Sequence, residues 1–295
     1  MIDALQQHQN FYLTTVFILG LLIGSFLNVV IYRLPVIFKR EWRKDCCNYL
    51  EENYKATIQL HTGNEPAEPF NLIKPDSTCP NCGHQIRSWE NIPVISYLFL
   101  KAKCSNCKTP ISIRYPFIEL LSASLAALCA WHFGFSLAGF SAILLSWALI
   151  SLAMIDYDTQ YLPDQITLPF LWLGLILNLN NTFTDIESAI IGVIAGYLTL
   201  WSVHHLFKLI TKKEGMGYGD FKLLALLGAW MGWQVLPAVI ILSSLVGSII
   251  GISLILFKKH RREIPIPFGP YLAIAGWIAL LWGNEINQSY IRWIS

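Results

Sequence analysis

Two segments of the sequence carry carboxylates beside long apolar runs. Asp156, Asp158 and Asp164 cluster in one of them, and Asp220 closes the glycine-rich segment Gly215–Asp220 in the other. Ionisable side chains at membrane depth are costly and usually mark functional sites. Two carboxyl groups that lie close together can hydrolyse an amide, because one takes a proton from water while the other, protonated, donates to the carbonyl oxygen. These acids are therefore candidate catalytic groups.

Structural roles for the same acids remain open. Asp158 and Asp164 could end a helix in the headgroup region, and Asp164, which follows Pro163, could cap the next helix. The glycines before Asp220 allow a tight turn and close approach to another segment. They could also cradle a phosphate, but the Lys-Ser/Thr of a P-loop is absent and a carboxylate would repel that ligand.

Four cysteines form two C-x-x-C pairs, which are separated by 21 residues: Cys79 with Cys82, and Cys104 with Cys107. Each pair can offer two thiolates from a tight turn, and two such turns complete a tetrahedral zinc site. The alternative is a pair of disulfides. The distribution of positive charge, described below, places this segment in the reducing cytosol, which disfavours disulfides. We expect a structural Zn²⁺ that folds the loop, because a closed four-thiolate site has no open position for catalysis.

Other polar residues in apolar runs allow more than one interpretation. His204 and His205 could be ligands or proton carriers, or simply be tolerated within a helix. Glu119 either binds a loop residue or is an interfacial acid. Lys222 is not expected to neutralise Asp220, because residues two positions apart do not share a helix face. Neither Gly-x-Ser-x-Gly nor His-Glu-x-x-His occurs in the chain.

The elements that must position these groups are membrane helices. Of the 295 residues, 54% are hydrophobic and only 14% are charged, against about a quarter charged in soluble domains. Eight apolar runs are candidate spans: Tyr12–Tyr32, Pro116–His132, Phe135–Ile155, Ile166–Leu179, Ala189–Ile210, Phe221–Trp233, Val235–Phe257 and Ile266–Trp282. Several reach the ~20 residues that a spanning helix needs, whereas the fourth and sixth are short enough to be re-entrant. We expect an all-α polytopic membrane protein with about eight transmembrane helices.

The positive charges indicate the topology. Of the 21 Lys and Arg residues, 20 lie in the intervals Arg33–Arg114, Lys208–Lys222 and Lys258–Arg262. Eight crossings put these three intervals on one side, the cytosol, and both termini outside. The first apolar run, Tyr12–Tyr32, has no basic residues before it. This pattern predicts a retained membrane anchor rather than a cleaved signal peptide. The net charge of +2 gives no reason to expect a nucleic-acid partner.

Three regions follow from this pattern. Residues 1–35 form the first transmembrane helix with a short outer N-terminus, residues 36–113 a cytosolic zinc-binding loop domain, and residues 114–295 a seven-helix membrane core. Within the loop domain, residues 41–76 are charged and read as a loop, and the ordered cysteine spacing follows them.

Six segments, in this order, resemble one known family, the bacterial prepilin leader peptidases. These are also N-methyltransferases and belong to the Gly-x-Gly-Asp class of membrane aspartyl proteases. The resemblance covers nearly the whole chain and rests on Gly24–Pro35, the two cysteine pairs, Arg114–Leu121, Ile155–Asp164, Gly215–Leu224 and Pro265–Pro270.

The resemblance implies both an activity and its residues. Asp156 and Asp220 would be the catalytic pair, although Asp158 and Asp164 lie within one loop of the first. The family cuts type IV prepilins and type II secretion pseudopilins at the cytosolic face of the bacterial inner membrane, between a basic leader ending in Gly and a hydrophobic helix that remains in the lipid. It then methylates the new N-terminus from S-adenosylmethionine. No glycine-rich fingerprint locates a site for that donor.

Two other functions fit parts of the sequence. A membrane protease of the signal-peptide-peptidase type would share the Gly-x-Gly-Asp segment, but the cysteine-bearing loop argues against it. An ion or metal transporter would have its acids near the middle of spans and paired discontinuous helices. Here the acids cluster at cytosolic ends, which favours the peptidase.

Overall fold

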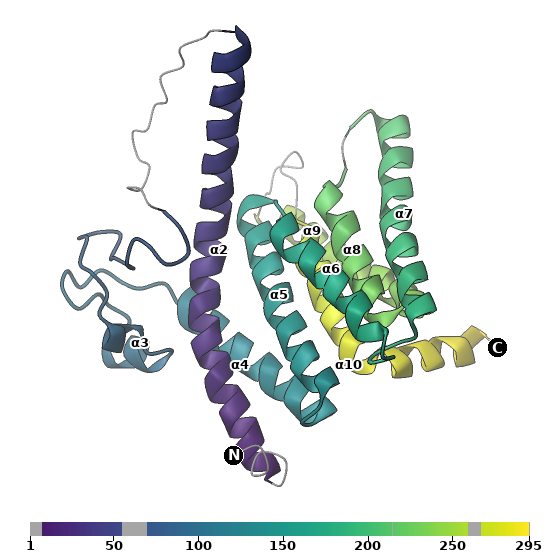
Figure 1. The fold of residues 1–295 in the computed structure, drawn as a ribbon, viewed down its shortest axis with the longest axis horizontal. Helices are drawn as coiled ribbons and strands as arrows, with labels where there is room; N and C mark the ends of the chain where they lie inside the picture. The colour runs from purple at the N-terminus through teal and green to yellow at the C-terminus, as the bar shows by residue number, and fades with distance from the viewer. Residues whose placement is uncertain (1–7, 55–69, 214, 259–266, 295) are drawn as a thin grey trace. The chain divides into compact units, whose positions relative to one another are not determined.

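The structure is a computed structural model that describes residues 8–54, 70–213, 215–258 and 267–294. These residues are helical apart from turns, loops and two isolated bridges, Thr78–Gln85 and Lys103–Pro110. The longer helices (Figure 1) are α2 (Gln9–Tyr54), α4 (Arg114–Phe133), α5 (Leu137–Thr159), α6 (Asp164–Asn178), α7 (Ile186–Thr211), α8 (Tyr218–Met231), α9 (Leu236–Lys258) and α10 (Gly269–Ile294). The short ones are α3 (Ile95–Phe99) and the 3₁₀ turns η1 (Ser88–Asn91) and η2 (Trp233–Val235).

The expected all-helical membrane fold is confirmed, since each of the eight apolar runs coincides with one of the long helices over most of its described residues. Among the described residues, five helices are long and apolar enough to cross a membrane: α2, α4, α5, α7 and the segment Trp233–Ser253 that contains most of α9. Gly269–Gly283 of α10 is a shorter apolar segment. The crossings by α6 and α8 stay predictions.

Helix α2 is longer than the sequence analysis predicts. We expected a loop from residue 41, but the helix continues to Tyr54. The reason is that residues 36–54 contain neither Gly nor Pro and include many good helix formers. The remainder of that expected loop, residues 55–69, lies outside the described residues. The domain boundary after residue 35 stays a prediction and falls within α2.

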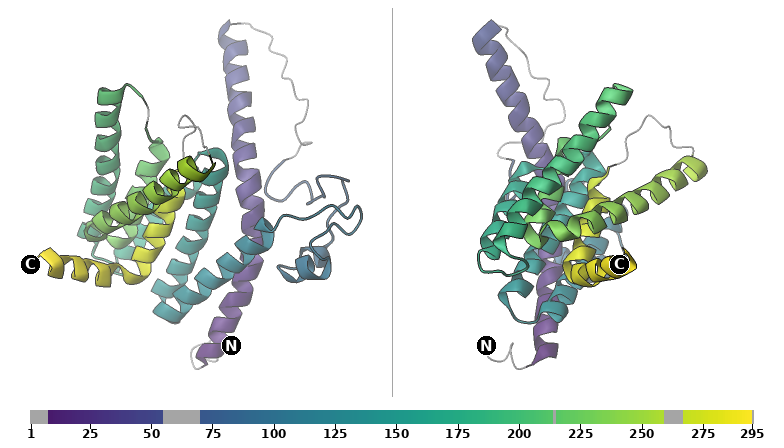
Figure 2. Two further views of the ribbon diagram at one scale, coloured as in Figure 1. Left: turned by 180° about the vertical axis from the view of Figure 1, so that it is seen from behind. Right: turned by 90° about the vertical axis from the view of Figure 1, so that its right-hand side faces the viewer.

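The chain divides into two compact units, which we describe separately. The core unit comprises the described residues of 1–16 and 125–295, and the cysteine unit comprises those of 17–124. Helix α8 is at the centre of the core unit, where it packs against α6, α7 and α10 (Figure 2). Apart from Lys222, every residue from Asp220 to Met231 is buried. The C-terminal end of α9, by contrast, extends away from the other helices in the right-hand view of Figure 2.

Small residues allow α7 and α8 to cross closely. A Cβ atom on Gly228 would lie 2.2 Å from the carbonyl oxygen of Gly192, and one on Gly196 would lie 2.8 Å from that of Leu224. Glycine at such crossings lets two membrane helices pack backbone to backbone. This contact fixes α8, and with it Asp220, against α7.

The C-terminal end of α8 is closed by a side chain of α6. The amide of Asn178 donates to the carbonyl oxygens of Ala229 at 2.8 Å and Trp230 at 3.0 Å. Buried helix ends otherwise leave carbonyl groups without partners. The indole of Trp230 in turn donates to the Phe170 carbonyl at 2.7 Å. Helix α8 is therefore fixed along its side by the crossing with α7 and at its C-terminal end by hydrogen bonds from α6.

Candidate active site and metal site

Asp156 occupies the last turn of α5 and is buried, with 5% of its surface exposed. Its Oδ2 accepts a hydrogen bond from the backbone N–H of Gly269 at 3.0 Å. Helix α5 ends three residues later, where Gln160 takes a left-handed conformation at φ +55°. The acid is thus placed by a helix end and held by the first residue of α10.

Asp220 lies in the first turn of α8 and is 6% exposed. It is close enough to Asp156 for the two charges to interact. Its Oδ1 is buried and has no hydrogen-bond partner among the described residues. Two buried carboxyl groups from separate helices therefore lie within range of an electrostatic interaction, an arrangement from which acid–base hydrolysis of an amide can proceed.

The other two acids of the cluster do not join this pair. Asp158 is exposed on α5. Asp164 accepts both hydrogen bonds of a salt bridge from Lys222, at 2.7 and 2.8 Å. The interpretation of Asp164 as a helix cap is wrong, because Pro163 is the N-cap of α6 and the Asp164 carboxylate is occupied by Lys222.

The two histidines of α7 lie among aromatic rings. His204 is 2% exposed and packs against Tyr218 and Phe221, with ring centroids 5.4 and 5.5 Å away. The His205 ring lies 4.1 Å from that of Trp201. Within the described residues, neither histidine belongs to a cluster of three or more potential metal ligands.

Glu119 is the partner of a loop residue, which decides between the two interpretations left open above. Its carboxylate on α4 accepts from the backbone N–H of Val94 at 2.8 Å. Val94 has φ +60° and ψ −46°, values close to those of a strained γ-turn. In the same unit a Cβ on Gly24 of α2 would lie 2.7 Å from the Glu119 Cα. Glu119 thus lies where α2, α4 and the loop before α3 meet.

The four cysteines of the two pairs come together as the spacing predicts. The Sγ atoms of Cys79, Cys82, Cys104 and Cys107 all lie within 4.8 Å of one another, and none forms a disulfide. The Cys79 and Cys107 sulfurs are 3.7 Å apart. A tetrahedral zinc site with Zn–S bonds of about 2.3 Å separates its sulfurs by about 3.8 Å. The donor set therefore fits Zn²⁺.

Hydrogen bonds around the cysteines prepare them for a metal. The hydroxyl and backbone of Thr109 lower the pKa of Cys107 to about 5, so its thiolate forms readily. Glu90, between the two cysteine pairs in the sequence, is buried. Hydrogen bonds from Ser105, the Arg87 backbone and His84 lower the pKa of its carboxyl. Such outer contacts hold metal-binding turns in place.

Together these features define a helical membrane protein with a buried carboxylate pair in its core unit and a four-thiol site in its cysteine unit. Comparison with protein families identifies it further. Residues 18–133 match the bacterial peptidase A24 N-terminal domain, and residues 143–252 match the type IV leader peptidase family. No solved structure is a significant match.

Curated relatives agree with the family models over almost the whole chain. A prepilin leader peptidase/N-methyltransferase of Stutzerimonas stutzeri is 55% identical, with 93% of this chain and 92% of the relative aligned. Those of Pseudomonas aeruginosa and Neisseria gonorrhoeae are 51% and 46% identical, over 99% and 94% of this chain and 98% and 93% of theirs. The chain belongs to the prepilin leader peptidase/N-methyltransferase family. The resemblance seen in the sequence is confirmed, and the chain is a bacterial membrane protein.

The hydrogen bond from Gly269 to Asp156 has no counterpart among the contacts predicted from the sequence. Gly269 falls in the segment Pro265–Pro270, which carried the family resemblance but suggested no role for this residue; Pro265 and Ile266 lie outside the described residues. A backbone donor has no side-chain signature, and Gly269 is 113 positions from Asp156. Only the packing of α10 beside α5 reveals the pairing.

Proposed function

We propose that the chain is a membrane aspartyl endopeptidase in which Asp156 and Asp220 remove the basic leader of type IV prepilins and type II secretion pseudopilins. The same chain methylates the newly formed N-terminus. The observation that supports the peptidase assignment is the electrostatic interaction between these two buried carboxyl groups, one at the end of α5 and one at the start of α8.

In this mechanism the two acids share one proton. The ionised carboxylate takes a proton from a water molecule, which attacks the carbonyl carbon of the scissile amide. The protonated carboxyl donates to the carbonyl oxygen, and proton transfer to the departing nitrogen completes the cleavage. Gly269 contributes by orienting Asp156, and the cut follows the Gly at the end of the leader.

The location of the pair supports the choice of substrate. Both acids lie at helix ends that the positive-inside pattern assigns to the cytosolic face of the inner membrane. A basic leader would be attracted to acids at that interface. The apolar helix that follows the leader would remain in lipid beside the enzyme.

Each cofactor has a separate role. Zn²⁺, held by Cys79, Cys82, Cys104 and Cys107, would fold the cytosolic loop, because a site closed by four thiolates leaves no position for substrate. S-adenosylmethionine would supply the methyl group that the N-terminal amine accepts. The names of the curated relatives support this second activity.

The decisive experiment incubates purified protein with a synthetic or recombinant prepilin and reads the product N-terminus by mass spectrometry. We expect cleavage after the Gly of the leader and, with S-adenosylmethionine present, a mass increase of one methyl group. Asp156→Ala and Asp220→Ala should each abolish cleavage while the protein still inserts in the membrane.

Asp158→Ala is the matched control, because this acid is on the same helix as Asp156 but exposed. It should cleave at close to the wild-type rate. Normal processing by either Asp156→Ala or Asp220→Ala would refute the assignment of the pair. Cuts within the transmembrane segment of the substrate would favour a signal-peptide-peptidase type of activity instead.

A further inference from the structure

The segment between the two metal-binding turns carries exposed apolar side chains. It contains η1 and α3, and no residue of α3 is buried. Large side chains with 43–82% of their surface exposed recur along it, and we call them the α3 patch: Trp89, Ile92, Ile95, Leu98 and Phe99. Soluble proteins rarely expose apolar surface on this scale unless it contacts a partner or a membrane.

Contacts within the cysteine unit place the start of α3 beside membrane helices. The backbone N–H of Val94 donates to the carboxylate of Glu119 in α4 at 2.8 Å. Glu119 in turn lies against α2, because a Cβ on Gly24 would be 2.7 Å from its Cα. Both α2 and α4 are long and apolar enough to cross a membrane. In Figure 1, α3 accordingly lies level with α4 and beside the lower half of α2.

The rise of the two helices gives the depth of this contact. Arg33 is the first charged residue after the apolar run of α2, and Gly24 precedes it by nine positions, or about 13 Å. Along α4, Glu119 follows Arg114 by five positions, or about 8 Å. The headgroup region of one leaflet is about 5–8 Å thick. With both arginines among the headgroups, Val94 lies at the boundary with the acyl chains or below it.

The backbone of the segment suits a place without water, where every polar group needs a partner from the protein. The N–H groups of Ser96, Leu98 and Leu100 donate to carbonyl oxygens four residues earlier, at 2.9–3.1 Å. Those of residues 101–103 donate to carbonyl oxygens of residues 97–100. Val94 and Glu119 satisfy each other, as expected for a carboxylate at membrane depth.

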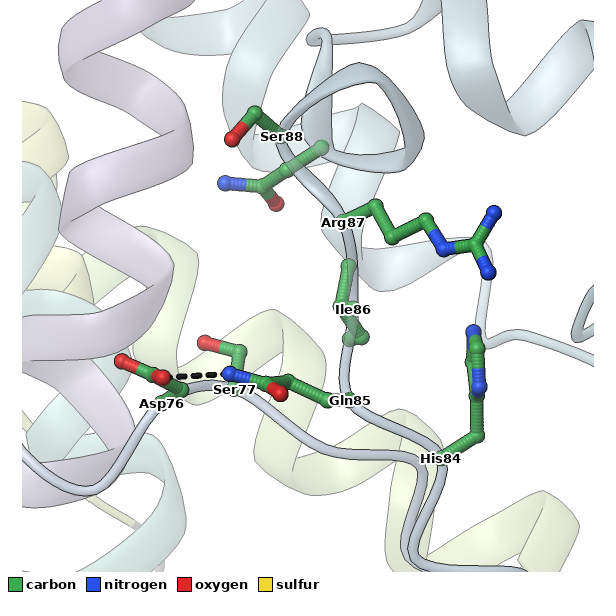
Figure 3. Close-up of a pocket in the computed structure, with 8 residues that line it drawn as sticks. Asp76, Ser77, His84, Gln85, Ile86, Arg87 and Ser88 are labelled. Carbon is green, nitrogen blue, oxygen red and sulfur yellow. Dashed lines mark hydrogen bonds between the residues drawn. The ribbon is translucent and has the colours of Figure 1, made fainter.

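The neighbouring parts of the loop are polar. Side chains of residues 76–91 line a hollow whose labelled members in Figure 3 are mostly polar or charged, and Gln85 there donates to Asp76. After the patch come two exposed cations, Lys101 and Lys103. An apolar segment bordered by lysines is typical of an element that lies in a membrane interface, with its cations reaching the headgroups.

We propose that the α3 patch is embedded in the cytosolic leaflet of the membrane, with its apolar side chains among acyl chains and Lys101 and Lys103 at anionic headgroups. This part of the loop is then not surrounded by cytosol, and it holds the metal-binding turns at the membrane surface. The placement depends on the membrane character of α2 and α4 and not on the peptidase assignment. A protein partner fits less well, because the Glu119 contact puts the patch at the depth of lipid.

The test introduces the photocross-linker benzoylphenylalanine at Phe99 or Leu98 of the full-length, zinc-loaded protein. The protein is reconstituted in nanodiscs of phosphatidylethanolamine and phosphatidylglycerol, irradiated, and analysed for lipid adducts by mass spectrometry. Tyr49 is the matched control, an exposed aromatic residue about 24 Å beyond Arg33 along α2. We expect about tenfold more lipid adduct at positions 98 and 99 than at position 49, because only the former contact acyl chains.

Zinc content and thermal unfolding, measured on the same preparations, show that each variant is folded. Equal lipid adducts at positions 99 and 49 would overturn the proposal. Cross-links from position 99 to a prepilin or to a second copy of the chain, in place of lipid, would overturn it as well and would make the patch a protein-binding surface.

A second measurement reports the surroundings of the patch without a covalent reaction. Trifluoromethylphenylalanine at Phe99 should show a fluorine NMR signal that is broadened more by lipid with a nitroxide on its acyl chain than by a water-soluble nitroxide. The same label at Tyr49 should show the reverse order. Stronger broadening by the water-soluble nitroxide at position 99 would place the patch in water and contradict the proposal.

Discussion

Gly269, at the start of α10, donates its backbone N–H to Oδ2 of Asp156, in the last turn of α5, over 3.0 Å. The two residues are 113 positions apart. A Cβ atom at position 269 would lie 2.7 Å from that same oxygen. The carboxylate therefore depends on two properties of Gly269, its N–H and its lack of a side chain.

The first prediction follows from this contact. Gly269→Ala should displace the Asp156 carboxylate and reduce leader cleavage by about a hundredfold, since a misplacement of about 1 Å can cost that much in rate. Product formation by mass spectrometry gives the rate. Gly247→Ala is a suitable control, because its Cβ would contact ring carbons of the Tyr271 side chain, the nearest at 3.1 Å, rather than a carboxylate or the backbone. Equal rates for the two variants would show that Gly269 does not position the acid.

The second prediction concerns the pair Lys222 and Asp164. Both side chains are partly exposed, at 31% and 44%. A double-mutant cycle with Lys222→Gln and Asp164→Asn should therefore give a coupling energy of only about 0.2–1 kcal/mol, measured by thermal unfolding in detergent. Asp164→Asn should still cleave prepilin. Loss of cleavage in that variant would return Asp164 to the catalytic candidates.

The sequence predicts the features of this fold that depend on residues close together in the chain better than those that depend on contacts between distant residues. Apolar length and the distribution of Lys and Arg are local properties, and they located the eight helices and the membrane character. The C-x-x-C spacing likewise predicted the four-thiol cluster. The end of α2 was missed, because the charged segment after residue 41 suggested a loop, whereas the absence of Gly and Pro allows the helix to continue.

The carboxylate pair shows where sequence reasoning stops. Asp156, Asp158 and Asp164 are equivalent as acids, and only tertiary packing separates them. One is buried beside α10, one is exposed and one is bound to Lys222. Family resemblance favoured Asp156, but no pattern in the sequence indicated its contact with Gly269, because a backbone N–H is common to every residue except proline.

The third prediction tests the crossing of α7 and α8. Replacing Gly in a helix by Ala normally favours the helix by up to about 1 kcal/mol. At Gly228 the added Cβ would lie 2.2 Å from the Gly192 carbonyl oxygen, so the two helices must separate. We expect Gly228→Ala to destabilise the protein by about 1–3 kcal/mol, which a lower Tm in detergent would show. Because α8 carries Asp220, cleavage should fall too; an unchanged or higher Tm would contradict this view of the crossing.

The fourth prediction concerns backbone strain after α3. Lys101 adopts φ +52°, a left-handed conformation that costs a residue with a side chain roughly 1–2 kcal/mol. Lys101→Gly should relieve part of that cost and slow both zinc release and proteolysis of the cysteine unit. Lys103→Gly provides the comparison, because Lys103 is not among the residues with positive φ and glycine there only adds flexibility to the unfolded chain. It should have the opposite effect, and equal shifts in both variants would exclude strain as the cause.

The last prediction separates the metal site from the peptidase. Cys79 and Cys104 are the buried members of the cluster, and a serine hydroxyl is a poor replacement for a thiolate ligand of Zn²⁺. Cys79→Ser and Cys104→Ser should each reduce bound zinc from one per chain to a small fraction, measured by elemental analysis, and make the cysteine unit sensitive to protease. Cys46→Ser, a change at an exposed cysteine outside the cluster, should retain the metal. Because Asp156 and Asp220 belong to the core unit, leader cleavage should fall less than metal content does. Complete loss of cleavage in a cysteine variant whose core helices remain folded would show instead that the peptidase requires the metal-bound unit.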